Sequence, residues 1–182
     1  APSRGLGDVY KRQLPSDWRL LYKNTEGPEP EEDKRLSAWF LSKENTGNSK
    51  DICAKIMDES NDASEYTGGA YLGFSMIRIP EMYYIMAEAL LEEGDRVRAR
   101  DYLDIVVSAR GMVKFADRDT GKDITLEDIM NERRKELFGE GQWWFCLKRL
   151  NRDIYVDALD ATLKGGDKIY TLPLPTEELD PR

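Results

Sequence analysis

Apolar residues recur at the three- and four-residue spacing of one helix face in two consecutive segments between residues 79 and 111. Pro80 suits the first turn of the first segment, because its missing N–H costs nothing there. Gly94 ends that helix, and Asp95 can cap the next one, which ends at Gly111. Because the break between the segments is short, we predict an antiparallel helical hairpin.

Small residues stand where these two helices are expected to cross. Ala87 and Ala99 are twelve residues apart, with Tyr83 four before the first and Leu103 four after the second. Tetratricopeptide repeats place large and small residues at these offsets so that two helices can approach closely. Any tight helix pair needs small residues at its crossing, so a generic helical hairpin remains an alternative.

A second helical hairpin is predicted from Ile124 to about Asn151. Thr125 can take the N-cap position of its first helix, and Asp128 stands at the capping-box position. Ile124 can pack against Ile129 as a hydrophobic staple. The predicted fold class is all-α, with tetratricopeptide-like helical hairpins, long loops and little or no sheet.

The remaining segments predict only short elements. We expect a short strand or turn over residues 36–41 and a short helix over residues 52–59. A last short helix is predicted from Asp153 to Leu163, before the pair Gly165-Gly166. Residues 168–175 are expected to be extended, because each proline biases its predecessor away from helix.

Charged residues stand on the apolar face of the second hairpin. Arg133 falls on that face, with Glu132, Glu136 and Glu140 beside it. A buried arginine needs a partner, and Glu136 lies within helical reach of it, as Lys135 lies within reach of Glu132. Glu132 and Glu140 can instead bridge to another helix. Carboxylates acting as acid and base are one interpretation; a structural ion network is the one we favour, because nothing nearby resembles a nucleophile or a substrate pocket.

Composition narrows the function classes. The chain has 182 residues, 40% of them apolar, which is enough for about one domain with a core of its own. Its net charge of −8, without any long basic run, argues against a nucleic-acid partner. No stretch approaches the roughly 18 apolar residues of a membrane-spanning helix.

Few residues of the sequence are candidates for metal binding or for acid–base catalysis. The sequence has no His, which removes the usual zinc ligands and the usual general base. Cys53 and Cys146 lack metal-binding spacing; they are either disulfide-bonded or, as we favour, buried thiols. Alternate acids in Asp117–Asp123 suit a calcium loop or simply a charged turn, and the misplaced glycine favours the turn. We expect neither a cofactor nor a metal site.

Six motifs resemble the SusD/RagB-like family, and they occur in the order seen there. They are Arg78–Leu90, Ser108–Gly111, Glu132–Leu137, Gly139–Gln142, Leu147–Arg149 and Leu172–Pro175. The resemblance covers roughly Leu14 to Leu179. It implies a non-catalytic, surface-exposed lipoprotein of the cell outer membrane, mostly helical around tetratricopeptide units. Such a protein captures nutrients, mostly glycans and oligosaccharides, as the lid of a SusC-like TonB-dependent transporter.

The chain also departs from the family's pattern. After Gly141 many members carry an Arg and then an Asp, where this chain has Trp143 and Cys146, so we expect a more apolar local core. We expect the family's N-terminal portion, with its signal peptide and lipid-bearing cysteine, to be missing from this chain. Residues 1–13 show no periodicity and precede the resemblance, so we expect them to be a non-native or disordered tail. Residues 14–182 are expected to be the C-terminal domain of a larger protein, with any membrane contact made through a lipid anchor absent from this chain.

Ligand-binding candidates are the aromatic residues outside the hairpins. Sugar sites commonly set an aromatic face among polar groups, which makes Trp39, Tyr66 and Tyr71 our candidates; the alternative is that they cover the hairpin core. A RagB-like subunit that captures peptides and a tetratricopeptide-type interaction scaffold are the alternative functions. A glycoside hydrolase with two carboxylates is disfavoured, because the acids stand beside Arg and Lys on helical faces.

Overall fold

A computed structural model describes residues 18–22, 33–45, 48–53, 55, 77–118, 122–156 and 159–171 of the chain. The chain folds as two compact units, Ala1–Gly139 and Glu140–Arg182, and each is described here by itself. The predicted tail at residues 1–13, the candidates Tyr66 and Tyr71, and part of the acidic loop at 117–123 lie outside the described residues.

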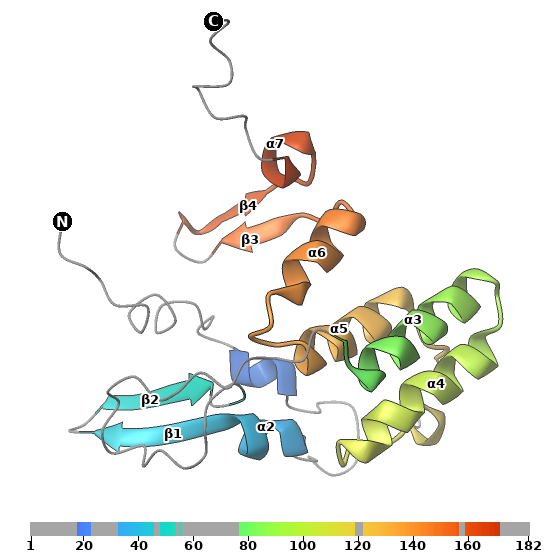
Figure 1. The fold of residues 1–182 in the computed structure, drawn as a ribbon, viewed down its shortest axis with the longest axis horizontal. Coiled ribbons are helices and arrows are strands. Elements are labelled where there is room, and N and C mark those ends of the chain that lie inside the picture. The colour runs from blue at the N-terminus through green and yellow to red at the C-terminus, as the bar shows by residue number, and fades with distance from the viewer. Residues whose placement is uncertain are drawn as a thin grey trace, which may run out of the picture. The chain divides into compact units, whose positions relative to one another are not determined.

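The first unit is mostly helical, as predicted (Figure 1). Its elements are η1 (Trp18–Tyr22), α2 (Lys34–Trp39), β1 (Phe40–Asn45), β2 (Asn48–Cys53), α3 (Ile79–Glu92), α4 (Arg96–Ala109), η2 (Phe115–Asp117) and α5 (Leu126–Glu136). The second unit contains α6 (Gln142–Arg149), β3 (Ile154–Val156), β4 (Ala161–Leu163) and α7 (Asp167–Tyr170).

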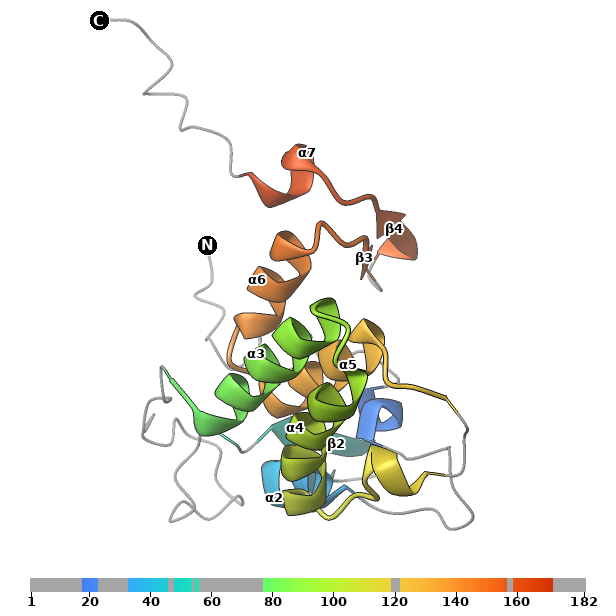
Figure 2. The same ribbon diagram turned by 90° about the vertical axis from the view of Figure 1, so that its right-hand side faces the viewer.

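The predicted hairpin over residues 79–111 is the pair α3–α4, which lies side by side in Figure 1 and Figure 2. Gly94 has the positive φ of 86° that a helix C-terminus favours. Asp95 caps α4 by accepting a hydrogen bond of 3.1 Å from the Arg98 backbone N–H. Ala87 and Ala99 are both fully buried, so the two helices approach through these small residues. The tetratricopeptide-like helix pair is therefore confirmed.

Helix α5 packs against α3 and completes the main hydrophobic core. The predicted capping box is present: the Asp128 backbone N–H donates to Thr125 Oγ1 at 3.3 Å, and the Thr125 backbone N–H donates to Asp128 Oδ2 at 2.8 Å. Ile124 and Ile129 are both buried in the core, as the predicted staple requires. The core cluster consists of Tyr84, Ala87, Leu90, Ala99, Leu103, Val106, Val107, Met112, Ile124 and Ile129.

The segments before α3 differ from the prediction. Of residues 36–41, expected to be a strand or turn, residues 36–39 belong instead to α2, which Asp33 caps by accepting a hydrogen bond of 3.0 Å from the Arg35 backbone N–H. Phe40 and Leu41 begin the strand β1, as expected. Residues 52 and 53, the start of the helix expected over 52–59, instead end β2, which pairs antiparallel with β1 from Phe40↔Cys53 to Asn45↔Asn48. The pairing with a neighbouring strand overrides the weak helical pattern at Ile52.

Three aromatic side chains of the first unit, from η1, β1 and the residues after α5, pack together. The rings of Tyr22 and Phe40 lie 5.4 Å apart edge-on, and those of Phe40 and Phe138 lie 5.3 Å apart. Tyr22 Oη donates a hydrogen bond of 3.0 Å to the Lys135 carbonyl. These contacts tie η1 and β1 to the end of α5.

The second unit corrects two further expectations. Within the predicted helix 153–163, residues 154–156 and 161–163 instead form the strands of the antiparallel hairpin β3–β4. Residues 168–170, the start of the stretch expected to be extended, belong to α7. The hairpin turns through Asp160, whose φ of 46° is left-handed. The rings of Trp144 on α6 and Tyr170 on α7 lie 5.3 Å apart. Cys146 is a buried thiol, and the side chain of Cys53 lies outside the described residues.

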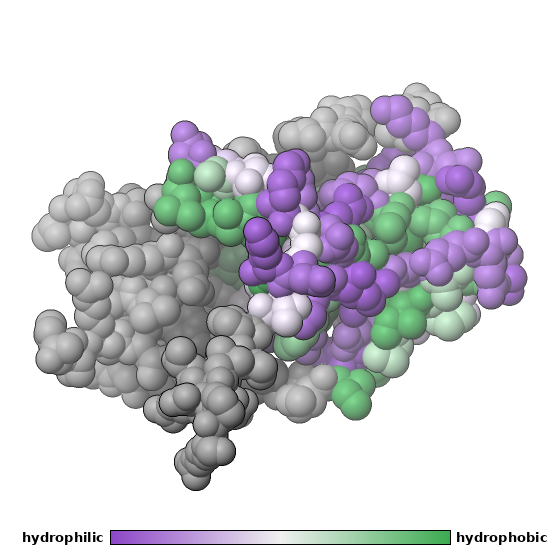
Figure 3. All heavy atoms as spheres, turned by 90° about the horizontal axis from the view of Figure 1, so that it is seen from above, coloured by the Kyte–Doolittle hydropathy of each residue, from purple (hydrophilic) through white to green (hydrophobic). Residues whose placement is uncertain are grey.

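The described surface is mixed in character. Figure 3 shows hydrophilic side chains interleaved with smaller hydrophobic areas, as a chain with 34% charged residues predicts. Within the described ranges, no helix has both the length and the apolar character needed to traverse a lipid bilayer.

Candidate functional site

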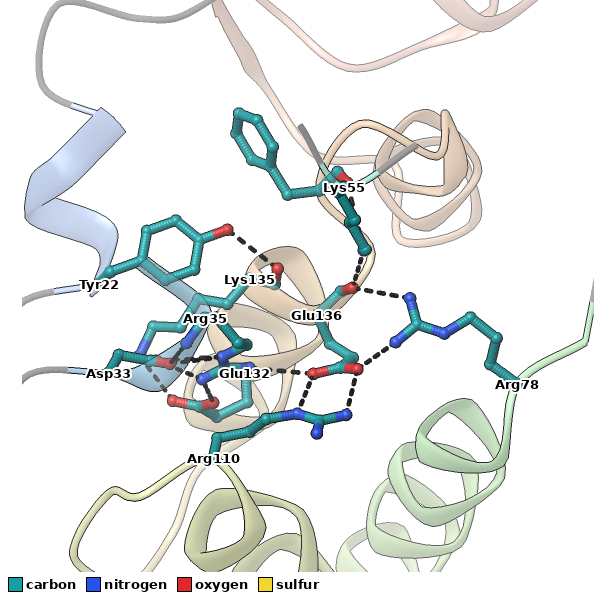
Figure 4. Close-up of polar contacts among 10 residues, drawn as sticks. Tyr22, Asp33, Arg35, Lys55, Arg78, Arg110, Glu132, Lys135 and Glu136 are labelled. Atoms are coloured by element: carbon teal, nitrogen blue, oxygen red, sulfur yellow. Dashed lines mark hydrogen bonds and ion pairs between the residues drawn. The ribbon is translucent and has the colours of Figure 1, made fainter. Parts of the chain in front are cut away.

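Among the described residues of the first unit, arginines and carboxylates form a buried cluster where α2, α3, α4 and α5 meet (Figure 4). We call it the arginine–carboxylate cluster. Its members are Asp33, Arg35, Arg78, Arg110, Glu132 and Glu136.

Arg35 is the centre of the cluster and is almost fully buried. Its Nη2 donates to Asp33 Oδ2 at 2.6 Å and to Glu132 Oε2 at 2.7 Å. Its Nε donates to Asp33 Oδ1 at 2.9 Å, so the Asp33 side chain caps α2 and holds the guanidinium at once. Burial alone would lower the pKa of Arg35, but its hydrogen bonds to Asp33 and the charge of Glu132 raise it. The guanidinium is therefore a permanent buried cation.

Glu136, the last residue of α5, is fully buried and receives three arginines. Arg110 binds it through two parallel bonds, Nε to Oε2 at 2.9 Å and Nη2 to Oε1 at 2.7 Å. Arg35 Nη1 lies 3.4 Å from Oε2, and Arg78 Nη2 donates to Oε1. Both carboxylate oxygens thus accept hydrogen bonds from two arginines each.

The C-terminal carbonyls of α5 are also covered by cations. Lys55 Nζ donates to the Glu136 carbonyl, and to the Phe138 carbonyl at 3.3 Å. Arg78 Nη1 donates to the Glu136 carbonyl at 3.3 Å. Positive charge at a helix C-terminus satisfies the unpaired carbonyls and complements the helix dipole. Arg78 therefore binds both the side chain and the backbone of one residue.

Trp39, one of the three predicted ligand contacts, lies at the edge of this cluster. Lys55 Nζ is 4.1 Å from the centre of its ring, and the guanidinium carbons of Arg78 and Arg110 are each 5.9 Å away. The indole is half-buried, and cations share its surroundings with any sugar that would stack on it. Tyr66 and Tyr71, the other two candidates, lie outside the described residues.

The predicted ion network is divided between two places. Glu132 and Glu136 lie in the arginine–carboxylate cluster, and Lys135 Nζ lies 2.6 Å from Glu132 Oε1 as the helical spacing predicts. The expected pair of Arg133 with Glu136 is wrong. Arg133 instead pairs with α3, its Nη2 lying 3.1 Å from Glu81 Oε1 and its Nη1 3.9 Å from Glu88 Oε2.

The neighbouring helices explain why Arg133 and Glu136 do not pair. Glu136 meets arginines that come from α2, from the start of α3 and from the end of α4, while Arg133 meets two acids of α3. Because these partners come from other helices, Arg133 and Glu136 do not have to bend toward each other along α5. Glu140, the fourth residue of the predicted network, belongs to the second unit.

Four members of the cluster were not identified from the sequence. They are Asp33, Arg35, Arg78 and Arg110. Arg78 and Arg110 stand inside two of the six family motifs, so the motifs were a usable signal, but Asp33 and Arg35 follow a stretch of sequence with no periodic pattern.

The chemistry of the cluster is that of a fixed structural joint. Burial and Glu132 raise the pKa of Tyr84, so this fully buried phenol stays protonated. Across the described ranges, no three His, Cys, Asp or Glu side chains are grouped to hold a metal ion. Buried and mutually neutralised charges position helices; they do not present a reactive group to a substrate.

Comparison with known proteins agrees with the sequence motifs. The family model described as the SusD family matches residues 41–172, which is well over half of the chain. The match confirms the resemblance drawn from the six motifs and, with it, the expectation of a non-catalytic protein. Searches of curated proteins and of solved structures found no match. The chain thus belongs to the SusD family, whose members are helical, non-catalytic proteins of the cell surface that bind glycans as partners of SusC transporters.

Proposed function

We propose that this protein captures an oligosaccharide at the surface of the outer membrane and passes it to a SusC-like TonB-dependent transporter. The observation that carries the proposal is the SusD family match over residues 41–172. The composition agrees with it, because an acidic chain with a net charge of −8 is poorly suited to polyanionic nucleic acid.

The construction of the site supports capture rather than conversion. A glycosidase needs two carboxyl groups that face the scissile bond, one of them able to exchange a proton. Glu132 and Glu136, the buried acids of α5, are each held by arginine or lysine inside the joint between helices. We therefore assign them to holding the scaffold on which ligand-binding loops are displayed.

The ligand contacts that we propose in the first unit remain Trp39, Tyr66 and Tyr71. Aromatic rings supply stacking surface, and neighbouring polar groups supply hydrogen bonds to hydroxyls. The contacts of Trp39 with Lys55 and Arg78 give it a second role in the joint. Trp39→Ala is therefore expected to lower both ligand retention and stability, whereas Tyr71→Ala is expected to lower retention alone.

Affinity electrophoresis against a panel of polysaccharides tests the proposal. We expect one or more polysaccharides to retard the wild-type protein, without any new reducing ends after prolonged incubation. Reducing ends that accumulate with time would show that the protein hydrolyses the polysaccharide, and would contradict a purely binding function. Retention by none of the polysaccharides, together with binding of unstructured peptides in a fluorescence polarisation assay, would favour the peptide-capturing alternative.

The proposed partner calls for its own experiment. Co-expression with a SusC-like transporter, followed by size-exclusion chromatography in detergent, should give a single co-eluting peak. Elution as two separate peaks at micromolar concentrations would contradict the partnership. Glycan hydrolases encoded beside the same transporter would favour sugar, and peptidases would favour peptide.

A further inference from the structure

The hairpin β3–β4 presents a polar face with one aromatic ring in its middle. Tyr155 lies directly opposite Thr162 in the antiparallel register, and Asp153 and Lys164 are the next residues on the same side. All four side chains are exposed, whereas Ile154, Val156 and Ala161 on the other side are half-buried. We call the exposed side the hairpin face; its members are Asp153, Tyr155, Asp160, Thr162 and Lys164.

Tyr155 is exposed and yet held in place. Its ring is 59% exposed, and its Oη donates a hydrogen bond of 2.7 Å to Asp160 Oδ1. Asp160 stands at the turn, where its left-handed φ of 46° is tolerated better by Asp than by most residues. An aromatic side chain fixed before binding loses little conformational entropy on contact with a ligand, which favours its use as a stacking surface.

The other groups of the hairpin face are fixed as well. Lys164 Nζ lies 2.6 Å from Asp153 Oδ2, and the Gly165 backbone N–H donates to Asp153 Oδ1 at 2.9 Å. These two bonds lower the pKa of Asp153, so its carboxylate stays ionised as a hydrogen-bond acceptor. Gly165 permits this arrangement, since a Cβ there would lie 2.3 Å from the Asn151 carbonyl oxygen.

From this geometry we infer that the hairpin face binds one sugar unit of an uncharged glycan. The ring of Tyr155 stacks on the apolar side of the sugar, while Asp160 and Thr162 exchange hydrogen bonds with its hydroxyls. The inference rests on the proposed function and adds a site in the second unit to it.

Charge decides which class of glycan fits. The hairpin face carries the carboxylates of Asp153 and Asp160 against the single ammonium of Lys164, so its net charge is negative. Uronic acids and sulfated sugars are repelled by such a face, whereas the hydroxyls of a neutral sugar can donate to the carboxylates without charge repulsion. The expected ligands are therefore neutral polysaccharides.

The test compares two exposed aromatic residues of the same unit. Tyr155→Ala removes the proposed stacking surface, and Phe145→Ala on α6 removes a ring that is 63% exposed but lies off the hairpin. Both are assayed by affinity electrophoresis with neutral and acidic polysaccharides. We expect Tyr155→Ala to weaken retention by a neutral polysaccharide about fivefold to tenfold, and Phe145→Ala to leave it unchanged.

A second variant keeps the test decisive if Tyr155→Ala does not fold. Thr162→Arg adds bulk beside the ring at an exposed position, so it should block the sugar while near-ultraviolet circular dichroism stays that of the wild type. Normal retention of either folded variant overturns the inference and leaves the proposed function standing. Equal weakening by Phe145→Ala, or retention only by acidic polysaccharides, also overturns it. A wild-type protein that no polysaccharide retards overturns the proposed function and the inference together.

Discussion

Arg110 and Glu136 meet through two parallel hydrogen bonds of 2.9 and 2.7 Å, which join the end of α4 to the end of α5. Such a planar contact fixes direction as well as distance. Because the same carboxylate also receives Arg35 and Arg78, one side chain sets the positions of α2 and of three further helix ends. The glutamate acts as a structural anchor between segments that are far apart in the sequence.

Glu136→Ala tests this anchor. Removing the carboxylate leaves three guanidinium groups without their shared partner, and leaving a buried charge uncompensated costs about 3–5 kcal/mol. We expect a fall of this size in the free energy of unfolding, measured by urea denaturation followed by circular dichroism. Glu92→Ala is the matched control, because Glu92 is also the last residue of its helix but is exposed. Equal losses for the two variants would contradict the anchor.

Glu132 predicts how stability depends on pH. Burial alone would raise its pKa, but Lys135 and Arg35 together hold it below its ordinary value of 4.5. A carboxyl whose pKa is lower in the folded state stabilises the protein above the unfolded value, and that contribution is lost as the pH falls through the folded value. Urea midpoints should therefore drop below about pH 4.5, and by less in Glu132→Gln than in the wild type. Parallel curves for the two proteins between pH 6 and pH 3 would disprove the assignment.

The crossing of α3 and α4 is tested by enlarging one of its small residues. Ala87 is fully buried at the crossing, whereas Ala89, two residues on, is exposed on the same helix. Ala87→Leu should lower the free energy of unfolding by about 1–3 kcal/mol, because the added atoms force the helices apart. Ala89→Leu is expected to leave the thermal midpoint nearly unchanged. A well-folded Ala87→Leu protein of wild-type stability would show that the helices do not meet there.

Local patterns sufficed for the helices that carry their own signals. Pro80, Gly94, Asp95 and the Thr125 capping box mark the ends of α3, α4 and α5 within a few residues, and the structure confirms each of these ends. Helical spacing also placed Ala87 and Ala99 correctly, because the two helices that cross there follow each other directly in the chain.

Elements that depend on distant partners were not predictable in this way. Residues 48–53 become a strand because β1 pairs with them, and residues 154–156 pair with 161–163 as strands rather than lying in a helix. In the candidate site, helical spacing favoured Arg133 as the partner of Glu136, whereas the arginines that reach it lie 26 to 101 residues away in the chain. Spacing within one helix says which charges share a face but not which charges the other helices bring to it.

The capping box of α5 gives a further prediction, because this helix carries Glu132 and Glu136, two of the three acids of the cluster. Thr125→Ala removes the hydroxyl that accepts from the Asp128 backbone N–H, and losing such a cap costs about 0.5–2 kcal/mol. Since the far end of α5 is held by Arg110, Arg78 and Lys55, the loss should fray its first turn while the cluster stays intact. Hydrogen exchange should therefore speed up at residues 126–129 and stay slow at residues 133–136.

Thr162→Ala, which removes an exposed hydroxyl outside any helix cap, is the control and should leave both the thermal midpoint and the exchange of α5 unchanged. Acceleration along the whole of α5 would mean that the cap, and not the arginine–carboxylate cluster, holds the helix in place.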